Sequence, residues 1–362
     1  MPRGGSARRK PLGDAIAAAE KAFESKNPSE ALAQARRAIE EDPGSVPGLH
    51  YAAAALVELG RLDDAKEAYE RALATAPNDP DVIFGMADLL ISRLGDEREI
   101  IERGLELCQR GVRRARKKGD SELVGEFALL EAIALNHLGL PKDALVRIEE
   151  ASERFPRDPD VLLERGIALF ELCRFAAAGK AFRQVVEKHP DDAWAHHYLG
   201  LVSERGGDAA AARRHLARAQ RIAPDDFPRP VDFTAEDFDR SVEEALAELP
   251  ERVRQYLTNV AITVEDLPAT EDLTAGDAPL SPSILGVFRG QSLNEQRRFH
   301  DYVGTADPWN YQPSSIVLFQ RNLQRFARSR EELIEQIGIT LIHEVGHFLG
   351  LDEEELRERG LE

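Results

Sequence analysis

Proline recurs at a fixed interval between Pro43 and Pro224. Pro43 and Pro77 define a 34-residue period, and the same period separates Pro156, Pro190 and Pro224 from one another. The stretch from Pro77 to Pro156 holds two such periods and an 11-residue insertion. A period of this length indicates helical hairpins that stack into a solenoid, because a single hairpin cannot bury its apolar face alone.

Small and aromatic residues follow the same register. Tyr69 and Phe182 share one position, and Gly60 and Gly139 mark the turn between paired helices. Alanines at two further positions would let paired helices approach closely. The pattern resembles the tetratricopeptide repeat, over about residues 12–224, as five recognisable repeats and a divergent unit across 80–124 that absorbs the insertion. The alanines are Ala31, Ala65, Ala144, Ala178 and Ala212 at one position, and Ala38, Ala72, Ala151 and Ala219 at the other.

The resemblance implies an all-α, right-handed superhelix whose concave groove holds an extended peptide or a partner helix. We therefore expect a protein partner or a substrate in this groove. Some members of the family clamp a terminal carboxylate with Lys and Asn side chains. Here Ile16, Glu20, His50 and Ala54 occupy the corresponding positions, so we do not expect such a clamp.

The repeat register ends at Pro224. The segment that follows, Asp225–Pro230, contains two prolines that bar regular helix, and we interpret it as a linker. The chain is therefore expected to have a flexible N-terminus over 1–11, a repeat domain over 12–224, a linker over 225–231 and a second domain over 232–362.

The second domain is predicted to be a small α+β module. The helical pattern covers about 236–257 and about 331–348. Three β-rich runs lie between these helices, at Val260–Val264, Ile284–Phe288 and Ser315–Phe319.

The last helix contains the motif His343-Glu344-Val345-Gly346-His347. Two imidazoles at i and i+4 lie on one helix face about 6 Å apart, which suits two ligands of one zinc ion. Glu344 is turned aside by about 100° and could reach a water on the metal. The alternative is two surface histidines that meet by accident. The buried stripe is expected on the opposite face, at Ile334, Leu341, Val345 and Phe348.

This module resembles the minimal zincin-like metallopeptidases of bacteria, across about residues 236–355. The resemblance implies zinc-dependent hydrolysis of peptide bonds, with His343 and His347 as ligands and Glu344 as the general base. It also implies an acidic third ligand beyond the glycine of the motif. Besides 343–350, the resemblance rests on Glu244-Ala245 with Leu249-Pro250, Asn259-Val260-Ala261 leading to Val264-Glu265-Asp266, Leu285-Gly286-Val287-Phe288 and Ile316-Val317-Leu318-Phe319.

A third protein ligand is needed because two histidines alone bind zinc weakly, and a catalytic site keeps one position for water and substrate. In the extended zincin pattern this ligand falls ten residues after the first histidine, which is Glu353 here. Asp352 and Glu354 adjoin it, so either neighbour could be the ligand instead. Acidic residues are also favoured in the first turn of a helix, without any metal.

Three further features of zincins can be checked in the sequence: the methionine turn, a late glutamate ligand and donors to the substrate oxyanion. The only methionines are Met1 and Met86, so no methionine turn can lie beneath the metal. A late glutamate ligand, as in gluzincins, would have to be Glu358 or Glu362. Donors to the substrate oxyanion are expected among His300, Tyr302 and Tyr311, unless these are loop or packing residues.

The strand before the motif helix lies at the cleft in zincins, where an extended peptide can pair with its free edge. This strand would be Ser315–Phe319. The alternative is an interior strand with both edges paired.

Charge excludes two classes of partner. Of the net charge of −18, residues 231–362 contribute −14, from 12 Arg, no Lys and 26 Asp and Glu. An acidic domain repels nucleic acid and anionic membranes, so we expect neither as a partner. The basic run across 110–118 lacks interleaved aromatic residues and is interpreted as a solvated helix end.

Composition also limits the cellular location. Cys108 and Cys173 cannot form a disulfide framework, and no apolar run reaches the roughly 18 residues of a membrane span. The basic N-terminus is not followed by an apolar signal core. We therefore expect a cytoplasmic protein.

The sequence thus predicts a zinc metallopeptidase fused to a repeat domain that binds a partner or positions the substrate. The alternative is an interaction scaffold whose zinc site is structural or inactive, because Glu353 and its neighbours close the open coordination position.

Overall fold

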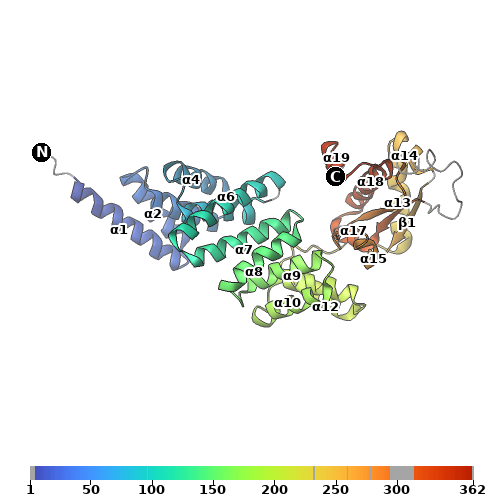
Figure 1. The fold of residues 1–362 in the computed structure, drawn as a ribbon, viewed down its shortest axis with the longest axis horizontal. Helices are drawn as coiled ribbons and strands as arrows, with labels where there is room; N and C mark the ends of the chain where they lie inside the picture. The colour runs from blue at the N-terminus through green and yellow to red at the C-terminus, as the bar shows by residue number, and fades with distance from the viewer. Residues whose placement is uncertain are drawn as a thin grey trace. The chain divides into compact units, whose positions relative to one another are not determined.

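The computed structural model describes residues 5–95, 97–230, 233–258, 260–276, 279–293 and 314–360. The chain forms two compact units (Figure 1). The first comprises residues 1–169 and 180–189, and the second comprises 170–179 and 190–362. None of the helices in the described ranges is long and apolar enough to cross a membrane.

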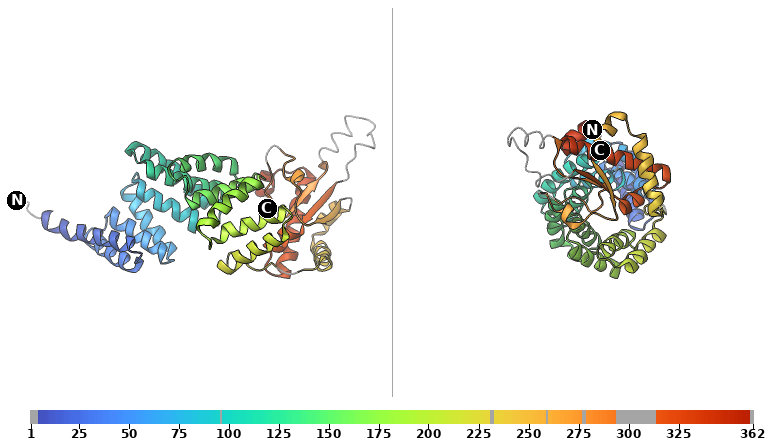
Figure 2. Two further views of the ribbon diagram at one scale, coloured as in Figure 1. Left: turned by 90° about the horizontal axis from the view of Figure 1, so that it is seen from below. Right: turned by 90° about the vertical axis from the view of Figure 1, so that its right-hand side faces the viewer.

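The first unit consists of helices packed in consecutive pairs, as predicted for a tetratricopeptide-repeat superhelix (Figure 2). The first helix begins at Gly5, ahead of the expected start of the repeats at residue 12. The pairs are α1 (Gly5–Glu24) with α2 (Pro28–Glu41), α3 (Val46–Glu58) with α4 (Leu62–Thr75), α5 (Pro80–Asp88) with α6 (Arg98–Lys118), and α7 (Ser121–His137) with α8 (Pro141–Arg154). Further along the chain come α9 (Pro159–Glu171), α10 (Phe175–Lys188), and the pair α11 (Ala193–Arg205) and α12 (Ala209–Ile222).

The repeat register explains this packing. The alanines at both predicted positions are buried, which lets neighbouring helices approach closely. Helix starts are fixed by side chains that accept hydrogen bonds from free N–H groups of the first turn. These capping residues include Asn27, Ser45, Asp79 and Asp120.

The divergent unit is a complete hairpin. Helix α5 runs on as a π-helical turn, η1 (Leu89–Arg93), and α6 has 21 residues, whereas α2, α4 and α8 each have 14. Most of the 11-residue insertion therefore lengthens a helix.

Helix α9 carries a buried carboxylate. Glu164 is 9% exposed, and the Asn136 Nδ2 of α7 donates hydrogen bonds to its Oε2 (2.7 Å) and to its backbone carbonyl (3.2 Å). Burial raises the pKa of Glu164, the hydrogen bond from Asn136 opposes this rise and the charge of Asp160 adds to it, and the net pKa is about 7.

The second unit contains a three-stranded sheet of β1 (Ala261–Glu265), β2 (Gly286–Arg289) and β3 (Ser315–Phe319). The strand order is β1-β3-β2. β1 lies parallel to β3 with Ala261 opposite Ser315, and β2 lies antiparallel to β3 with Gly286 opposite Leu318. The expectation that 315–319 offers a free edge is therefore wrong, because β3 is the central strand and both of its edges are paired.

The predicted α+β module is confirmed. Its helices are α13 (Ala235–Glu248), α14 (Glu251–Leu257), α15 (Thr270–Leu273), α17 (Gln320–Phe326), α18 (Arg330–Leu349) and α19 (Glu353–Glu358). The helical stretch expected over 236–257 is interrupted at Pro250, which precedes α14.

One core joins the sheet to α13 and α18. Leu341, Val345 and Phe348 are buried as predicted, whereas Ile334 is only partly buried. Two residues that were not expected in the stripe, Leu333 and Ile337, are fully buried on α18. The first turns of this helix therefore present a slightly rotated face to the core.

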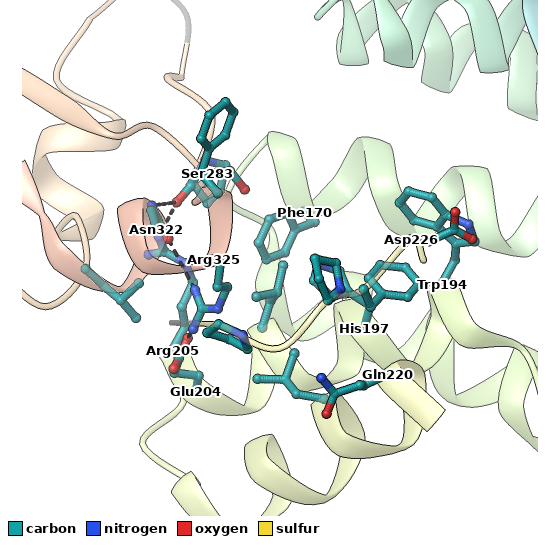
Figure 3. Close-up of a pocket in the computed structure, with 18 of the residues that line it drawn as sticks. Phe170, Trp194, His197, Glu204, Arg205, Gln220, Asp226, Ser283, Asn322 and Arg325 are labelled. Atoms are coloured by element: carbon teal, nitrogen blue, oxygen red, sulfur yellow. Dashed lines mark hydrogen bonds and ion pairs between the residues drawn. The ribbon is translucent and has the colours of Figure 1, made fainter. Parts of the chain in front are cut away.

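Helices α11 and α12 lie in the second unit, where a cavity of about 500 Å³ adjoins α11, α12 and α17 (Figure 3). Glu204 of α11 accepts hydrogen bonds from Arg321 and Arg325 of α17. The ring of Phe227, in the expected linker, stacks on His197 with centroids 4.5 Å apart. The compact unit therefore begins ahead of the expected linker.

The substitution Glu164→Gln tests the cost of burying this carboxylate. Because folding raises the pKa of Glu164, its contribution to stability is complete below the unfolded pKa and is lost as the pH rises through about 7. Glutamine does not ionise. We therefore expect the unfolding temperature of Glu164→Gln to fall less than that of the wild type between about pH 5 and about pH 8.

Differential scanning calorimetry measures this difference. The control is Glu149→Gln, at an exposed position of α8, which should follow the wild type. An equal fall in all three proteins would contradict the expected pH dependence.

Candidate metal centre

The two histidines of the motif lie one turn apart on α18. Their Nε2 atoms are 3.1 Å apart, so both imidazoles converge on one point beside the helix. The His347 Nδ1 lies 3.1 Å from the carbonyl oxygen of Leu351. A proton on Nδ1 donated to this carbonyl leaves the Nε2 lone pair of His347 directed toward the convergence point.

A tight reversal of the chain brings a carboxylate back to the histidines. Gly350 ends α18 in the left-handed conformation (φ 92°), and Asp352 caps α19 by accepting a hydrogen bond from the Glu355 N–H. Glu353 Oε1 then lies 3.3 Å from the His347 Nε2, and Glu353 Oε2 lies 3.8 Å from the His343 Nε2.

His343, His347 and Glu353 thus form a group whose ligand atoms lie within 4.8 Å of one another. Among the described residues, this is the group of His, Cys, Asp and Glu side chains with metal-binding geometry. Neither Asp352 nor Glu354 belongs to it, and Asp352 is engaged in the cap. Two imidazole nitrogens and one carboxylate oxygen match the donor set of catalytic zinc, which leaves a fourth position for water.

The position of Glu353 depends on Leu356, which the sequence analysis did not single out. Leu356 is fully buried, and its side chain occupies the space into which any side chain at Gly346 would project. The contact fixes α19 against α18. Leu356 follows Glu353 by three residues, so the two side chains lie on neighbouring positions of one helix face, and this spacing could have revealed the contact.

Glu344 faces the sheet. It is 5% exposed, and the backbone N–H of Phe288 in β2 donates a hydrogen bond to its carboxylate. Burial raises the pKa of Glu344, while His347, His343 and the Phe288 N–H oppose the rise. A raised pKa makes this carboxylate a better proton acceptor than an exposed glutamate.

Strand β2 approaches α18 closely at Gly286. A Cβ atom at this position would lie 2.7 Å from the Thr340 Cγ2 and 3.5 Å from the Glu344 Cγ. The glycine therefore allows the strand to lie against the helix beside Glu344.

The sequence analysis named five further candidates. His300, Tyr302, Tyr311 and Glu362 fall outside the described residues. Glu358 is exposed at the end of α19 and is not part of the metal-binding group.

Three family models of two kinds match the chain. The zincin-like metallopeptidase family matches residues 257–361. Tetratricopeptide-repeat families match residues 22–83 and 56–93, and residues 129–192 and 163–227. The chain therefore combines tetratricopeptide repeats with a zincin-like metallopeptidase domain. No curated protein sequence matches the chain.

Several solved structures are similar to part of this chain. PilW, a type IV pilus biogenesis factor, is 15% identical with a TM-score of 0.50, over 61% of this chain and 96% of PilW. PilF of Pseudomonas aeruginosa is 16% identical with a TM-score of 0.49, over 61% of this chain and 95% of PilF. A tetratricopeptide-repeat protein of Parabacteroides merdae is 13% identical with a TM-score of 0.46, over 68% of this chain and 97% of that protein.

The substitution Leu356→Ala tests whether the packing of α19 positions the carboxylate. Loss of the contact with Gly346 should release α19, so that Glu353 spends less time beside the histidines. Residues that orient a metal ligand typically contribute about 10- to 100-fold to affinity, and we expect a loss in this range for zinc. Competition with a chromogenic chelator measures it.

The matched control is Ile339→Ala, at an exposed position of α18, which should keep the wild-type affinity. Circular dichroism verifies that both variants are folded. A folded Leu356→Ala protein with unchanged zinc affinity would refute the positioning role.

Proposed function

We propose that this chain, which joins tetratricopeptide repeats to a zincin-like metallopeptidase domain, is a zinc-dependent peptidase whose repeats bind a protein partner or substrate. One observation carries the proposal: His343, His347 and Glu353 converge beside a buried carboxylate, Glu344. This arrangement supports a site in which three side chains hold a metal and Glu344 acts as a base beside it.

The residues have separate roles in this proposal. His343, His347 and Glu353 hold zinc, which when bound lowers the pKa of water toward about 7 and polarises the carbonyl of the substrate. Glu344 takes a proton from the attacking water and delivers it to the leaving amine. The Phe288 N–H orients the carboxylate of Glu344 for both transfers.

The substrate is proposed to be an extended peptide. Among the described residues, β2 pairs only with β3. On its other edge the Phe288 N–H is donated to Glu344, and we propose that a peptide backbone pairs with the remaining groups of this edge. Gly286 of this strand lies against Glu344, which would place a peptide on β2 close to the base.

The substitution Glu353→Ala tests the third ligand. Removal of a directly bound carboxylate should reduce zinc affinity strongly, by about 100-fold or more, because two histidines remain. Asp352→Ala and Glu354→Ala should have smaller effects. Chelator competition compares all three variants with the wild type. Equal affinity of Glu353→Ala and the wild type would assign the ligand to another residue.

The substitution Glu344→Gln separates catalysis from metal binding. Glutamine keeps the size of the side chain but loses the basic carboxylate, so zinc content and folding should stay near the wild type. Cleavage should fall by about 10² to 10⁴, which is the usual contribution of a general base. The assay uses the zinc-loaded full chain and a broad library of quenched fluorescent peptides.

Two further variants complete this assay. Glu335→Gln, at an exposed position of α18, should cleave like the wild type. His347→Ala should lose both zinc and cleavage. Undiminished cleavage by Glu344→Gln would exclude the proposed mechanism, and a wild type that cleaves no peptide of the library would favour a scaffold with an inactive zinc site.

A further inference from the structure

A cavity of about 440 Å³ opens on the first unit, where α5, η1, α7 and α9 meet. Its wall includes half-buried apolar side chains from three successive hairpins, and no described helix or strand covers them. We refer to this feature as the acidic groove. The apolar side chains include Phe84, Leu129, Ile133 and Leu163.

Every charged side chain that lines the acidic groove is a carboxylate. Glu126 and Asp160 stand one 34-residue period apart, so they occupy the same position in successive repeats and face the groove from α7 and α9. The others are Asp88, Asp158 and Glu164.

The arginine side chains near the acidic groove pair with carboxylates outside it. Arg147 pairs with Glu150 at 2.8 Å and approaches Glu131 at 3.8 Å, and Arg154 approaches Glu122 at 3.6 Å. No described Lys or Arg lies within ion-pair distance of Glu126 or Glu164. The groove therefore concentrates negative charge on an apolar surface, and the described part of the chain places no cation beside these two carboxylates.

Glu164 is the most deeply buried carboxylate of the groove. It is nine-tenths buried in the groove wall, and its Oε2 accepts the hydrogen bond from Asn136, whereas no described residue donates to its Oε1. A buried carboxylate that is stabilised by a neutral amide alone is costly to ionise, and a cationic group in the groove would supply both a donor and a charge.

We propose that the acidic groove binds an extended protein segment in which Lys or Arg side chains alternate with apolar side chains. The apolar side chains pack on Phe84, Leu129 and Leu163, and the cationic ones pair with Glu126, Asp160 and Glu164. The inference rests on the repeat half of the proposed function and is independent of the peptidase half.

The repeat geometry sets the spacing of the charges. Helices of neighbouring hairpins pack with axes about 8–10 Å apart, and an extended chain advances about 3.3 Å per residue. Carboxylates at the same position of successive repeats, such as Glu126 and Asp160, should therefore face cationic residues about three positions apart in the bound peptide.

Binding of three synthetic peptides to the full chain tests the proposal. Each peptide contains four copies of one triplet, Lys-Leu-Ser, Gln-Leu-Ser or Glu-Leu-Ser, and a fluorescein label reports binding by anisotropy. A chelator is present so that no peptide is cleaved. The lysine peptide should bind at least about tenfold more tightly than the glutamine peptide at low salt, because several partly buried ion pairs add. Salt should reduce the preference.

Groove variants locate the binding site. Glu126→Gln and Asp160→Asn should each reduce the preference for the lysine peptide several-fold, and Glu164→Gln should do so at pH above about 7, where the wild-type residue is ionised. The exposed Glu149→Gln on α8 is the matched control and should bind like the wild type.

The outcomes separate this inference from the proposed function. Equal binding of the lysine and glutamine peptides, abolished by Leu129→Ser, would leave peptide binding by the repeats intact and overturn the cationic preference. A lysine preference that persists in all groove variants would place the site elsewhere and also overturn the inference. Binding of none of the peptides would overturn both the inference and the proposed role of the repeats.

Discussion

The contact between Leu356 and Gly346 is the constraint on which the metal-binding geometry depends. The motif supplies two histidines on α18, but the carboxylate proposed as the third ligand lies beyond a chain reversal, and a flexible reversal would leave Glu353 in solvent. Leu356 prevents this, because it fills the space above Gly346 and so fixes the short helix α19 against α18. The side chain of Glu353 remains 62% exposed. Its position is therefore set by a neighbour that never touches the metal-binding atoms.

The parts of this protein that follow from local pattern could be predicted from sequence. The 34-residue period gives the helix pairs, and the spacing of His343 and His347 gives a two-imidazole site on one helix face. The order of the strands does not follow from such patterns, because a run such as 315–319 reads as a buried strand whether it is central or at an edge. The sequence analysis expected a free edge there, and pairing with β1 and β2 removes it. The docking of α19 is also a tertiary contact, for which only the spacing of Glu353 and Leu356 gave a signal.

The distribution of charge on the repeat domain is a second property that the net charge of the sequence does not show. Residues 1–230 carry a net charge of only −4, which suggests a nearly neutral repeat domain. The structure separates the charges, because Arg116, Arg147 and Arg154 pair with carboxylates outside the acidic groove, whereas the charged side chains that line the groove are carboxylates. The net charge does not show that the arginines and the groove carboxylates lie in different places. The register of the repeats could have revealed it, since Glu126 and Asp160 recur at one position.

Burial raises the pKa of Glu344 in the candidate metal centre and of Glu164 in the acidic groove, but different groups oppose the rise at the two sites. At Glu344 two imidazoles and the Phe288 N–H lie near the charge, so the protein itself supplies the groups that stabilise the ionised form. At Glu164 only the amide of Asn136 does so, and the neighbouring Asp160 acts in the opposite direction. The proposed metal site would therefore place its reactant, water, between groups that the protein already holds in position. In the acidic groove the described part of the chain supplies no counter-charge to Glu164, so a cationic partner is the group that would complete it.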